Sequence, residues 1–500
     1  MIDGAPVVGQ RPSSRNGRTE DRGSCVNPPL TLRAYLPARR ARARAAPGIP
    51  VPRGAKATEV DRAVQEAGIG QETGSRAATR PPFSLYPPRG RKGLDPTVLA
   101  SFASRLAAFR KAVLSQPQPR LYSALQILDF GQIHLRFGRR WEDLREKIFL
   151  IIEHALDRAI GPDDLYLVVD EEHAYLLLTG RRRAEAEARA RLVAAEITQR
   201  LCGLVPGGVA MRVQTLPFDY DTGLREVVSP RQLHERIAAF NRQLEDRERR
   251  AFRDNVMHFR ARYRPLVHLR KSLVSAYRVE ALLRRPEEPD APAETVCEER
   301  INGVFDAELD GWMLRRAGEA LRALRGRLRA FLVLPVHYET LAARRLRDSY
   351  LQHCRALPSH AARHLVFELL DLPPGMPQAS LQELVSYLRP FAFTLAARIE
   401  PELLTTEHLE GCDIRFLTAS WYGERLAEDF GERERVELWD RADIARFVVL
   451  GREARMRTAM LEIEEAGSLQ AVAAAGIDYG GGPLIAPPLA EPRARHAGGD

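Results

Sequence analysis

The stretch Tyr277-Arg278-Val279-Glu280-Ala281-Leu282-Leu283-Arg284-Arg285 decides the fold class of this chain. It places aromatic and β-branched residues before one carboxylate, and follows them with an apolar run and two arginines. Aromatic and β-branched residues are enriched in strands. The stretch therefore predicts a buried strand that delivers Glu280 and Arg284 to its end. The upstream run Tyr263–Leu269 predicts a second strand.

Short apolar stretches then alternate with helical patterns down to the C-terminus. They are Phe331–Val336, His364–Leu370, Phe393–Ile399, Ile414–Leu417, Met460–Leu461 and Ile477–Tyr479. Repeated βα units of this length predict a (β/α)8 barrel of the TIM type, in which ligand chemistry gathers at the C-terminal ends of the strands.

Together these landmarks resemble an EAL domain, the bacterial family that hydrolyses cyclic di-GMP, over about residues 259–490. The resemblance implies divalent metal held mainly by carboxylates, a glutamate base near the C-terminus and attack by water on the phosphodiester. Glu280 matches the glutamate of the EAL signature. Glu368, in Phe367-Glu368-Leu369-Leu370-Asp371, matches the first glutamate of the family's ExxE. These two residues are the metal-ligand candidates.

Other positions that the resemblance implies for the site carry unsuitable residues. Pro335 stands at the family's Asn, the stretch Leu395–Ile399 covers its paired aspartates, and Gly481 stands at its Gln. The expected catalytic base position is Leu461, and the family's lysine falls near Arg415. Loss of a general base alone costs about 10² to 10⁴ in rate. We therefore expect no catalytic residue in this barrel.

Two interpretations of the remaining charges stay open. Glu280 and Glu368 are either a vestigial metal site or strand-end carboxylates paired with Arg284 or Arg415. Arg284 and Arg415 are the candidate ligand-binding residues, because guanidinium groups bind phosphate well. No cofactor is expected, and Mg²⁺ or Mn²⁺ would be needed only if the barrel were active.

Residues 96–219 show a second pattern. Apolar residues at helical spacing are followed by elements in the order β, α, β, β, α, β, which predicts an α/β sandwich of one sheet with helices on one face. This order resembles a GGDEF domain, the diguanylate cyclase fold. The stretch Phe130–Gly138 stands where that family has FKxINDxYG and lacks its Lys, Asn and Asp.

The signature turn of that family falls on Asp170-Glu171-Glu172-His173-Ala174. Side chains and negative charge replace the glycines that would let the backbone approach a nucleotide phosphate. We therefore expect a degenerate GGDEF-like domain that does not condense GTP. The three carboxylates form either a divalent-ion site or an ordinary solvated turn.

Three further segments complete the predicted organisation. Residues 1–95 are rich in Arg and Pro without apolar periodicity, which predicts a disordered basic tail. Residues 220–256 predict a charged connecting helix, and 493–500 a short C-terminal tail after the 257–492 barrel. Residues 1–97 hold 17 Lys/Arg against 8 Asp/Glu, which accounts for the whole net charge of +9. A nucleic-acid interaction would have to use this tail.

Several functional classes lack sequence support. The five cysteines show no CxxC spacing, so neither a zinc site nor a disulfide framework is indicated. No GxxxxGK[ST], HExxH or GxSxG motif occurs. No apolar run approaches the roughly 18 to 20 residues of a membrane span. His268, His337 and His364 lie in apolar contexts and are expected to be structural. These observations predict a cytoplasmic protein without a membrane span.

The sequence thus predicts a catalytically inactive regulatory protein with a degenerate GGDEF-like domain and a degenerate EAL-like barrel. It would bind a regulatory protein partner, or cyclic di-GMP without hydrolysis, and a homodimer is a further expectation. Two alternatives remain. One is an active cyclic di-GMP phosphodiesterase with ligands from Glu400 or Glu462, and the other is a nucleic-acid binder that uses the basic tail.

Overall fold

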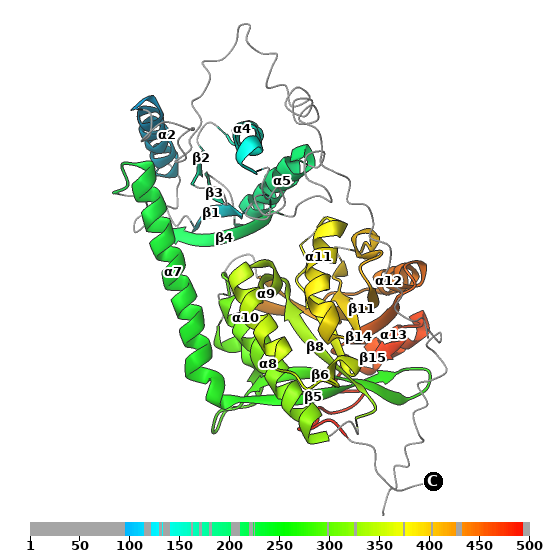
Figure 1. The fold of residues 1–500 in the computed structure, drawn as a ribbon. Coiled ribbons are helices and arrows are strands. Elements are labelled where there is room, and N and C mark those ends of the chain that lie inside the picture. The colour runs from blue at the N-terminus through cyan, green and yellow to red at the C-terminus, as the bar shows by residue number, and fades with distance from the viewer. Residues whose placement is uncertain are drawn as a thin grey trace, which may run out of the picture. The chain divides into compact units, whose positions relative to one another are not determined.

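The computed structural model describes residues 96–114, 122–129, 133, 141–161, 164–169, 173–179, 183–201, 211–219, 224, 226–297, 300–324, 328–373, 376–401, 404–426 and 433–493 (Figure 1). The predicted tail 1–95 and most of the predicted tail 493–500 lie outside these residues. So do the carboxylates Asp170–Glu172 and, apart from the buried Ile133, the stretch Phe130–Gly138.

The N-terminal body follows the predicted element order, including the predicted helix before the first strand. Its elements are α2 (Pro96–Leu114), β1 (Tyr122–Asp129), α4 (Trp141–Ala159), β2 (Leu165–Val168), β3 (His173–Leu178), α5 (Arg183–Leu201) and β4 (Arg212–Asp219). The strands form a four-stranded antiparallel sheet in the order β2-β3-β1-β4. An α/β sandwich is therefore present, and its GGDEF kinship remains a prediction.

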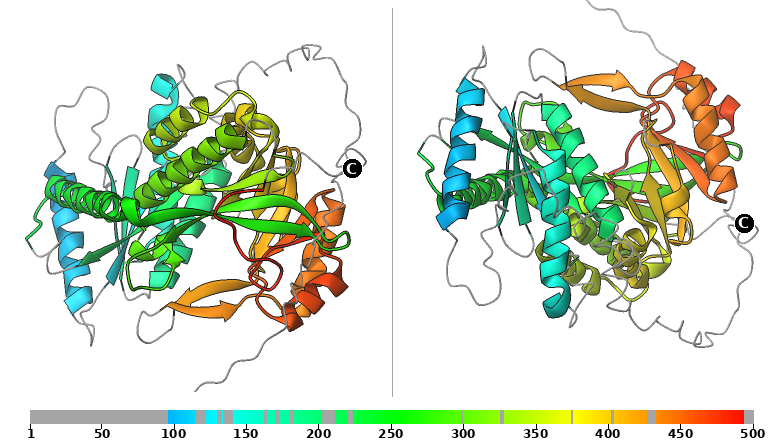
Figure 2. Two further views of the ribbon diagram at one scale, coloured as in Figure 1. Left: turned by 90° about the horizontal axis from the view of Figure 1, so that it is seen from below. Right: turned by 90° about the horizontal axis from the view of Figure 1, so that it is seen from above.

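Helices cover both faces of this sheet, whereas the sequence predicted one face. Successive side chains of a strand point to opposite faces of the sheet, and all four residues of β2 are buried, so both faces are covered there. Figure 2 shows α2 on the opposite side of the sheet from α4 and α5. Phe102, Leu106 and Phe109 on α2 lie in the core. The apolar stripe that predicted the helix thus also covers the second face.

The C-terminal body begins after α7 (Pro230–Asn255) and η3 (Val256–His258). Its strands are β5 (Phe259–His268), β6 (Leu273–Leu283), β7 (Ala291–Pro292), β8 (Phe331–His337), β9 (Leu365–Leu370), β10 (Thr394–Arg398), β11 (Ile414–Ser420), β14 (Arg457–Leu461) and β15 (Tyr479–Gly480). Its helices are α8 (Val304–Leu324), α9 (Tyr338–Ala342), α10 (Arg344–Arg355), α11 (Gln378–Leu388), α12 (Arg441–Glu453) and α13 (Ala466–Ala475). Short 3-10 turns η4 (Ala293–Val296), η5 (Ala361–Arg363), η6 (Arg389–Phe391) and η8 (Glu407–Leu409) join them.

Eight of these strands close into a barrel in the order β5-β15-β14-β11-β10-β9-β8-β6, because β6 also pairs with β5. The predicted closed barrel is confirmed. It departs from the regular (β/α)8 pattern at β5, which runs antiparallel to β6 and β15. Only Leu269–Ser272 separate β5 from β6, and a parallel crossover needs a dozen or more residues.

A second departure from the regular pattern follows β11. A two-stranded antiparallel hairpin, β12 (Tyr422–Leu426) and β13 (Arg433–Glu437), lies between β11 and α12. Among the helices that the structure describes, none is long and apolar enough to cross a membrane.

The barrel interior is layered from apolar to charged. An inner apolar cluster consists of Leu266, Ala276, Val333, Val366, Ala396 and Leu461, with Phe331 and Phe416 packed against it. Side chains alternate between the two faces of a strand, so the next inward positions toward the C-terminal ends lie two residues further on. Those positions are Arg278 on β6, Glu368 on β9 and Arg398 on β10. A charged layer therefore rests on an apolar floor.

Candidate functional site at the mouth of the barrel

The charged layer at the C-terminal ends of the strands is the candidate site, here called the mouth cluster. It consists of Arg264 on β5, Arg278 and Glu280 on β6, Glu368 on β9, Arg398 on β10, Thr418 on β11 and Glu462 directly after β14. The two predicted metal-ligand candidates, Glu280 and Glu368, both belong to it.

Glu368 lies at the centre of this cluster, and its side chain is completely buried. Its Oε2 accepts a hydrogen bond from Arg278 Nε at 2.8 Å. Its Oε1 accepts one from Arg398 Nη2 at 2.9 Å and one from the Thr418 hydroxyl at 2.6 Å. Glu368, Arg278 and Arg398 thus form a buried triad in which both carboxylate oxygens are engaged.

Glu280 is held in the same manner at the edge of the cluster. Its Oε1 accepts a hydrogen bond from Arg264 Nε at 2.6 Å and lies 3.7 Å from Arg278 Nη1. Arg264 and Arg278 face each other across the β5–β6 pair. Arg278 therefore lies between the two glutamates that the sequence assigned to metal.

The electrostatics follow from this pairing. Burial alone would raise the pKa of Glu368, but Arg278, Arg398 and the Thr418 hydroxyl outweigh it and lower the pKa to about 2. Burial alone would lower the pKa of Arg278, whereas Glu368, Glu280 and Glu462 raise it. The charged forms of Glu368 and Arg278 are thus stabilised at neutral pH.

A metal ion does not fit these residues. The guanidinium of Arg278 contacts or approaches both candidate carboxylates, and a divalent cation there would meet a fixed positive charge. Mg²⁺ requires several oxygen ligands around it. Within the part of the chain that the structure describes, no group of three or more His, Cys, Asp or Glu residues is arranged to hold a metal ion.

The structure places the other motif positions around this cluster. Pro335 is the register partner of Glu368 on β8 and offers no ligand oxygen. Leu461, the expected base position, is buried in the inner apolar cluster. At Gly481 a Cβ would lie only 2.6 Å from Leu266 Cδ2, so a longer side chain has no space. The inner wall is therefore apolar at Pro335, Leu461 and Gly481, where the EAL resemblance implies polar groups.

The predicted ligand-binding arginines do not join the mouth cluster. Arg284 lies just beyond β6, 55% exposed, and donates to both carboxylate oxygens of Asp290 at 2.8 and 3.0 Å. Arg415 is 64% exposed and lies 3.4 Å from Asp413. Its neighbour Phe416 packs against the inner apolar cluster, so strand alternation turns Arg415 to the outer face. Neither contacts Glu280 or Glu368, and the predicted pairing of those glutamates with Arg284 or Arg415 is wrong.

The sequence did not lead us to the arginines that pair with Glu280 and Glu368, which are Arg264, Arg278 and Arg398. A usable signal was present in the two strands that share the motif Ala-x-Arg. Ala276-Tyr277-Arg278 and Ala396-Ala397-Arg398 each carry an arginine two positions after a small inward-facing residue. That spacing places the arginine on the same face of the strand.

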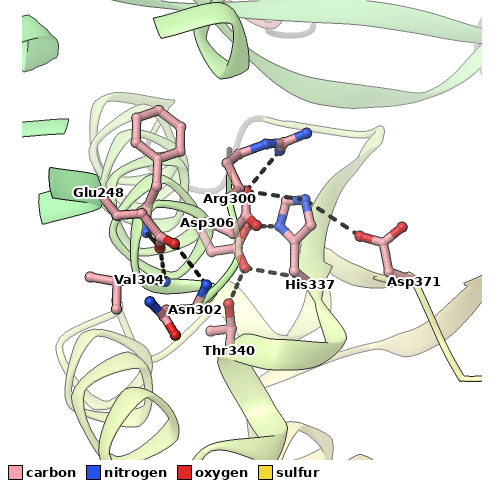
Figure 3. A network of polar contacts seen from close by, with 10 residues as sticks. Glu248, Arg300, Asn302, Val304, Asp306, His337, Thr340 and Asp371 are labelled. Atoms are coloured by element: carbon pink, nitrogen blue, oxygen red, sulfur yellow. Dashed lines mark hydrogen bonds and ion pairs between the residues drawn. The ribbon is translucent and has the colours of Figure 1, made fainter. Parts of the chain in front are cut away.

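A second polar network lies beside the mouth and centres on His337, at the end of β8 (Figure 3). Its Nδ1 is 2.9 Å from Asp310 Oδ1, and its backbone N–H donates to Asp310 Oδ2 at 2.9 Å. Its Nε2 lies 3.9 Å from both Asp306 Oδ1 and Asp371 Oδ2. Burial alone would lower the pKa of His337, but Asp310 and Asp306 raise it to about 10. Asp310 and Asp306 thus favour the protonated form of the His337 ring.

The other histidines predicted to be structural lie in different settings. His268 packs edge-on against Tyr479, with ring centroids 5.1 Å apart. His364 packs edge-on against His360, at 6.3 Å between centroids.

Comparisons with known proteins give no family match and no match among curated proteins. Solved structures similar to this chain include the "PaMucR Phosphodiesterase, c-di-GMP complex", at 14% identity and a TM-score of 0.36, over 46% of this chain and 97% of that one. The FimX EAL domain from Pseudomonas aeruginosa bound to c-di-GMP is 16% identical with a TM-score of 0.36, over 52% and 99%.

A third similar structure is the Bacillus subtilis YkuI protein, with an EAL domain, in complex with c-di-GMP and calcium. It is 14% identical with a TM-score of 0.39, over 49% of this chain and 58% of that one. With TM-scores below 0.5, none of these likenesses assigns a fold or a function. The barrel is established by the strand topology of the chain itself.

Proposed function

We propose that this chain is a regulatory protein whose EAL-like barrel does not hydrolyse phosphodiester bonds and acts by binding. The observation that supports this most strongly is the buried triad, in which the guanidinium groups of Arg278 and Arg398 occupy both oxygens of Glu368. A guanidinium group supplies positive charge but no open coordination position for water. The barrel mouth is therefore neutralised without being able to activate a nucleophile.

The proposed ligand is cyclic di-GMP, bound without hydrolysis, because the Tyr277–Arg285 stretch and the order of landmarks resemble the EAL family. A regulatory protein partner is the alternative on the same barrel. The GGDEF-like domain, the connecting helix and the homodimer belong to this proposal as well.

The direct test is to incubate the purified full chain with cyclic di-GMP and Mg²⁺ or Mn²⁺, and to follow linear dinucleotide by anion-exchange chromatography. We expect no more product than with Glu280→Gln. Hydrolysis that Glu280→Gln abolishes would refute the proposal and establish the active phosphodiesterase.

Calorimetric titration with cyclic di-GMP, with and without Mg²⁺, then separates the two modes of action. We expect binding with the same Kd in both buffers, because no metal site contributes to it. A complete lack of binding would reject the nucleotide as ligand and leave the protein partner.

A further inference from the structure

The connecting helix α7 is tied to the barrel by one buried carboxylate. Glu248 is 1% exposed and lies near the C-terminal end of α7, where Phe252 already belongs to the barrel core. Its Oε1 accepts a hydrogen bond from the backbone N–H of Asn302 at 2.7 Å. Its Oε2 accepts two more from the N–H groups of Val304 and Phe305, at 2.8 and 3.2 Å.

The N–H groups of Val304 and Phe305 are the first two donors of α8, which have no partners within their own helix, and Asn302 lies two residues before the helix begins. Glu248 thus caps α8 from outside, and its negative charge lies at the positive end of the helix dipole. Because the carboxylate accepts three N–H donors at once, a shift of α7 must either move the start of α8 or break this cap. Figure 3 shows Glu248 over the start of α8.

The first turns of α8 lead directly to the mouth. Asp306 accepts a hydrogen bond from Arg300 Nη1 at 2.8 Å, and Asp310 holds both the ring and the backbone of His337. Asp310 Oδ2 also accepts a hydrogen bond from the Thr340 hydroxyl at 2.6 Å. His337 in turn faces Asp371, which follows β9 directly and is the third residue after Glu368.

We propose that Glu248 is a coupling residue through which the position of α7 controls the barrel mouth, by way of α8, Asp310 and His337. Glu248 holds the start of α8, and Asp310 on the same helix holds His337. Because one helix carries both sets of hydrogen bonds, the cap and the His337 anchor open together. This coupling is independent of which ligand the mouth binds.

The backbone amides that make these contacts are direct probes of the coupling. In the full-length chain, hydrogen exchange measured by NMR at Val304 and Phe305 reports the cap. Exchange at the amide of His337 reports the anchor, and the amides of β14 serve as the distant reference. Glu248→Gln keeps one acceptor oxygen but replaces the other with a donor, which opposes the N–H groups of α8. Asp246→Asn is the matched control, because Asp246 is 61% exposed and pairs with Arg249 at 3.0 Å.

We expect Glu248→Gln to accelerate exchange at Val304, Phe305 and also His337 by at least about tenfold, and Asp246→Asn to change each by less than about twofold. If hydrogen exchange accelerated only at Val304 and Phe305, Glu248 would act as a helix cap alone and the proposed coupling would be wrong. Equal acceleration in β14 would overturn it too, because it indicates general loosening.

The reverse perturbation tests the same coupling even if Glu248→Gln fails to fold. Thr340→Val removes one donor to Asp310 with little change in shape. Coupling free energies are reciprocal, so exchange at Val304 and Phe305 should also rise, by several-fold. Unchanged exchange at these two amides in Thr340→Val would refute the proposal by itself.

Discussion

Glu368→Gln is the substitution that most directly probes the mouth cluster. It leaves two guanidinium groups, Arg278 and Arg398, largely buried without their shared carboxylate. Removing one partner of a buried ion pair costs about 3 to 5 kcal/mol. A second estimate comes from the fall in the pKa of Glu368 from 4.5 to about 2, at ~1.4 kcal/mol per unit, which gives about 3.5 kcal/mol. Because glutamine keeps one acceptor, we expect a loss near 3 kcal/mol.

Urea unfolding followed by tryptophan fluorescence measures this loss. Trp312, Trp421 and Trp439 all lie in the barrel core, so the signal reports mainly on the barrel. With a urea m-value of about 2 kcal/mol per M, the midpoint should fall by roughly 1.5 M. Asp413→Asn is the control, since Asp413 forms an exposed pair with Arg389 and should lose less than about 1 kcal/mol. A Glu368→Gln midpoint no lower than that of the control would refute the triad.

The pH dependence provides an independent check on the same residue. The folded pKa of Glu368 lies below its unfolded value, so its contribution is present above about pH 4.5 and is lost as the pH falls toward 2. The difference in unfolding free energy between wild type and Glu368→Gln should therefore shrink across this window. An equal difference at pH 7 and pH 2.5 would show that the carboxylate charge contributes nothing.

Three further outcomes test the surrounding structure. The folded pKa of His337 is raised to about 10, so its contribution to stability is present below pH 6.5 and is lost as the pH rises toward 10. The unfolding free energy of the wild type should therefore exceed that of His337→Gln by several kcal/mol less at pH 10 than at pH 6.5. A difference that does not change with pH would contradict this. Gly482→Ala places a Cβ 2.2 Å from the Ile463 carbonyl oxygen and should cost more than about 3 kcal/mol in urea unfolding, whereas Gly467→Ala, with open space around it, should be neutral or stabilising. Replacing the whole buried triad by leucine and methionine should cost less than Glu368→Gln alone, because no charge remains unpaired; a larger loss would show that the ion pairs themselves stabilise the barrel.

The sequence predicted the closed barrel because its landmarks are local. Each apolar strand segment can be recognised without knowing which strands it pairs with, and the order of these segments along the chain then predicts a closed barrel. The direction of β5 was open to prediction too, because Leu269–Ser272 leave no room for a crossover helix. The prediction of repeated βα units did not take this short turn between β5 and β6 into account. The side of the sheet covered by α2 could not be derived, since an apolar stripe shows that a helix packs but not against what.

The candidate site was predicted only in part. Glu280 and Glu368 both belong to the mouth cluster, where each contacts or approaches Arg278, because both face inward near the C-terminal ends of their strands. Arg284 lies beyond the end of its strand, where it forms an ion pair with Asp290. Arg415 was one residue out of phase with the inward face. A one-residue shift in a strand moves a side chain to the opposite face, so motif matching by approximate position cannot choose between them.

The mouth cluster also explains how Glu280 and Glu368 are accommodated in a barrel where they do not fit a metal. A buried carboxylate needs a compensating cation, and the fold is indifferent to whether a metal or a side chain provides it. Here Arg264 and Arg278 compensate Glu280, and Arg278 and Arg398 compensate Glu368. A divalent ion would add an exchangeable coordination position for water, whereas a guanidinium group offers only donors in a fixed plane. The inward-facing neighbours of a buried glutamate therefore determine whether a metal can bind there, and in this barrel Arg278 and Arg398 leave Glu368 a role in stability.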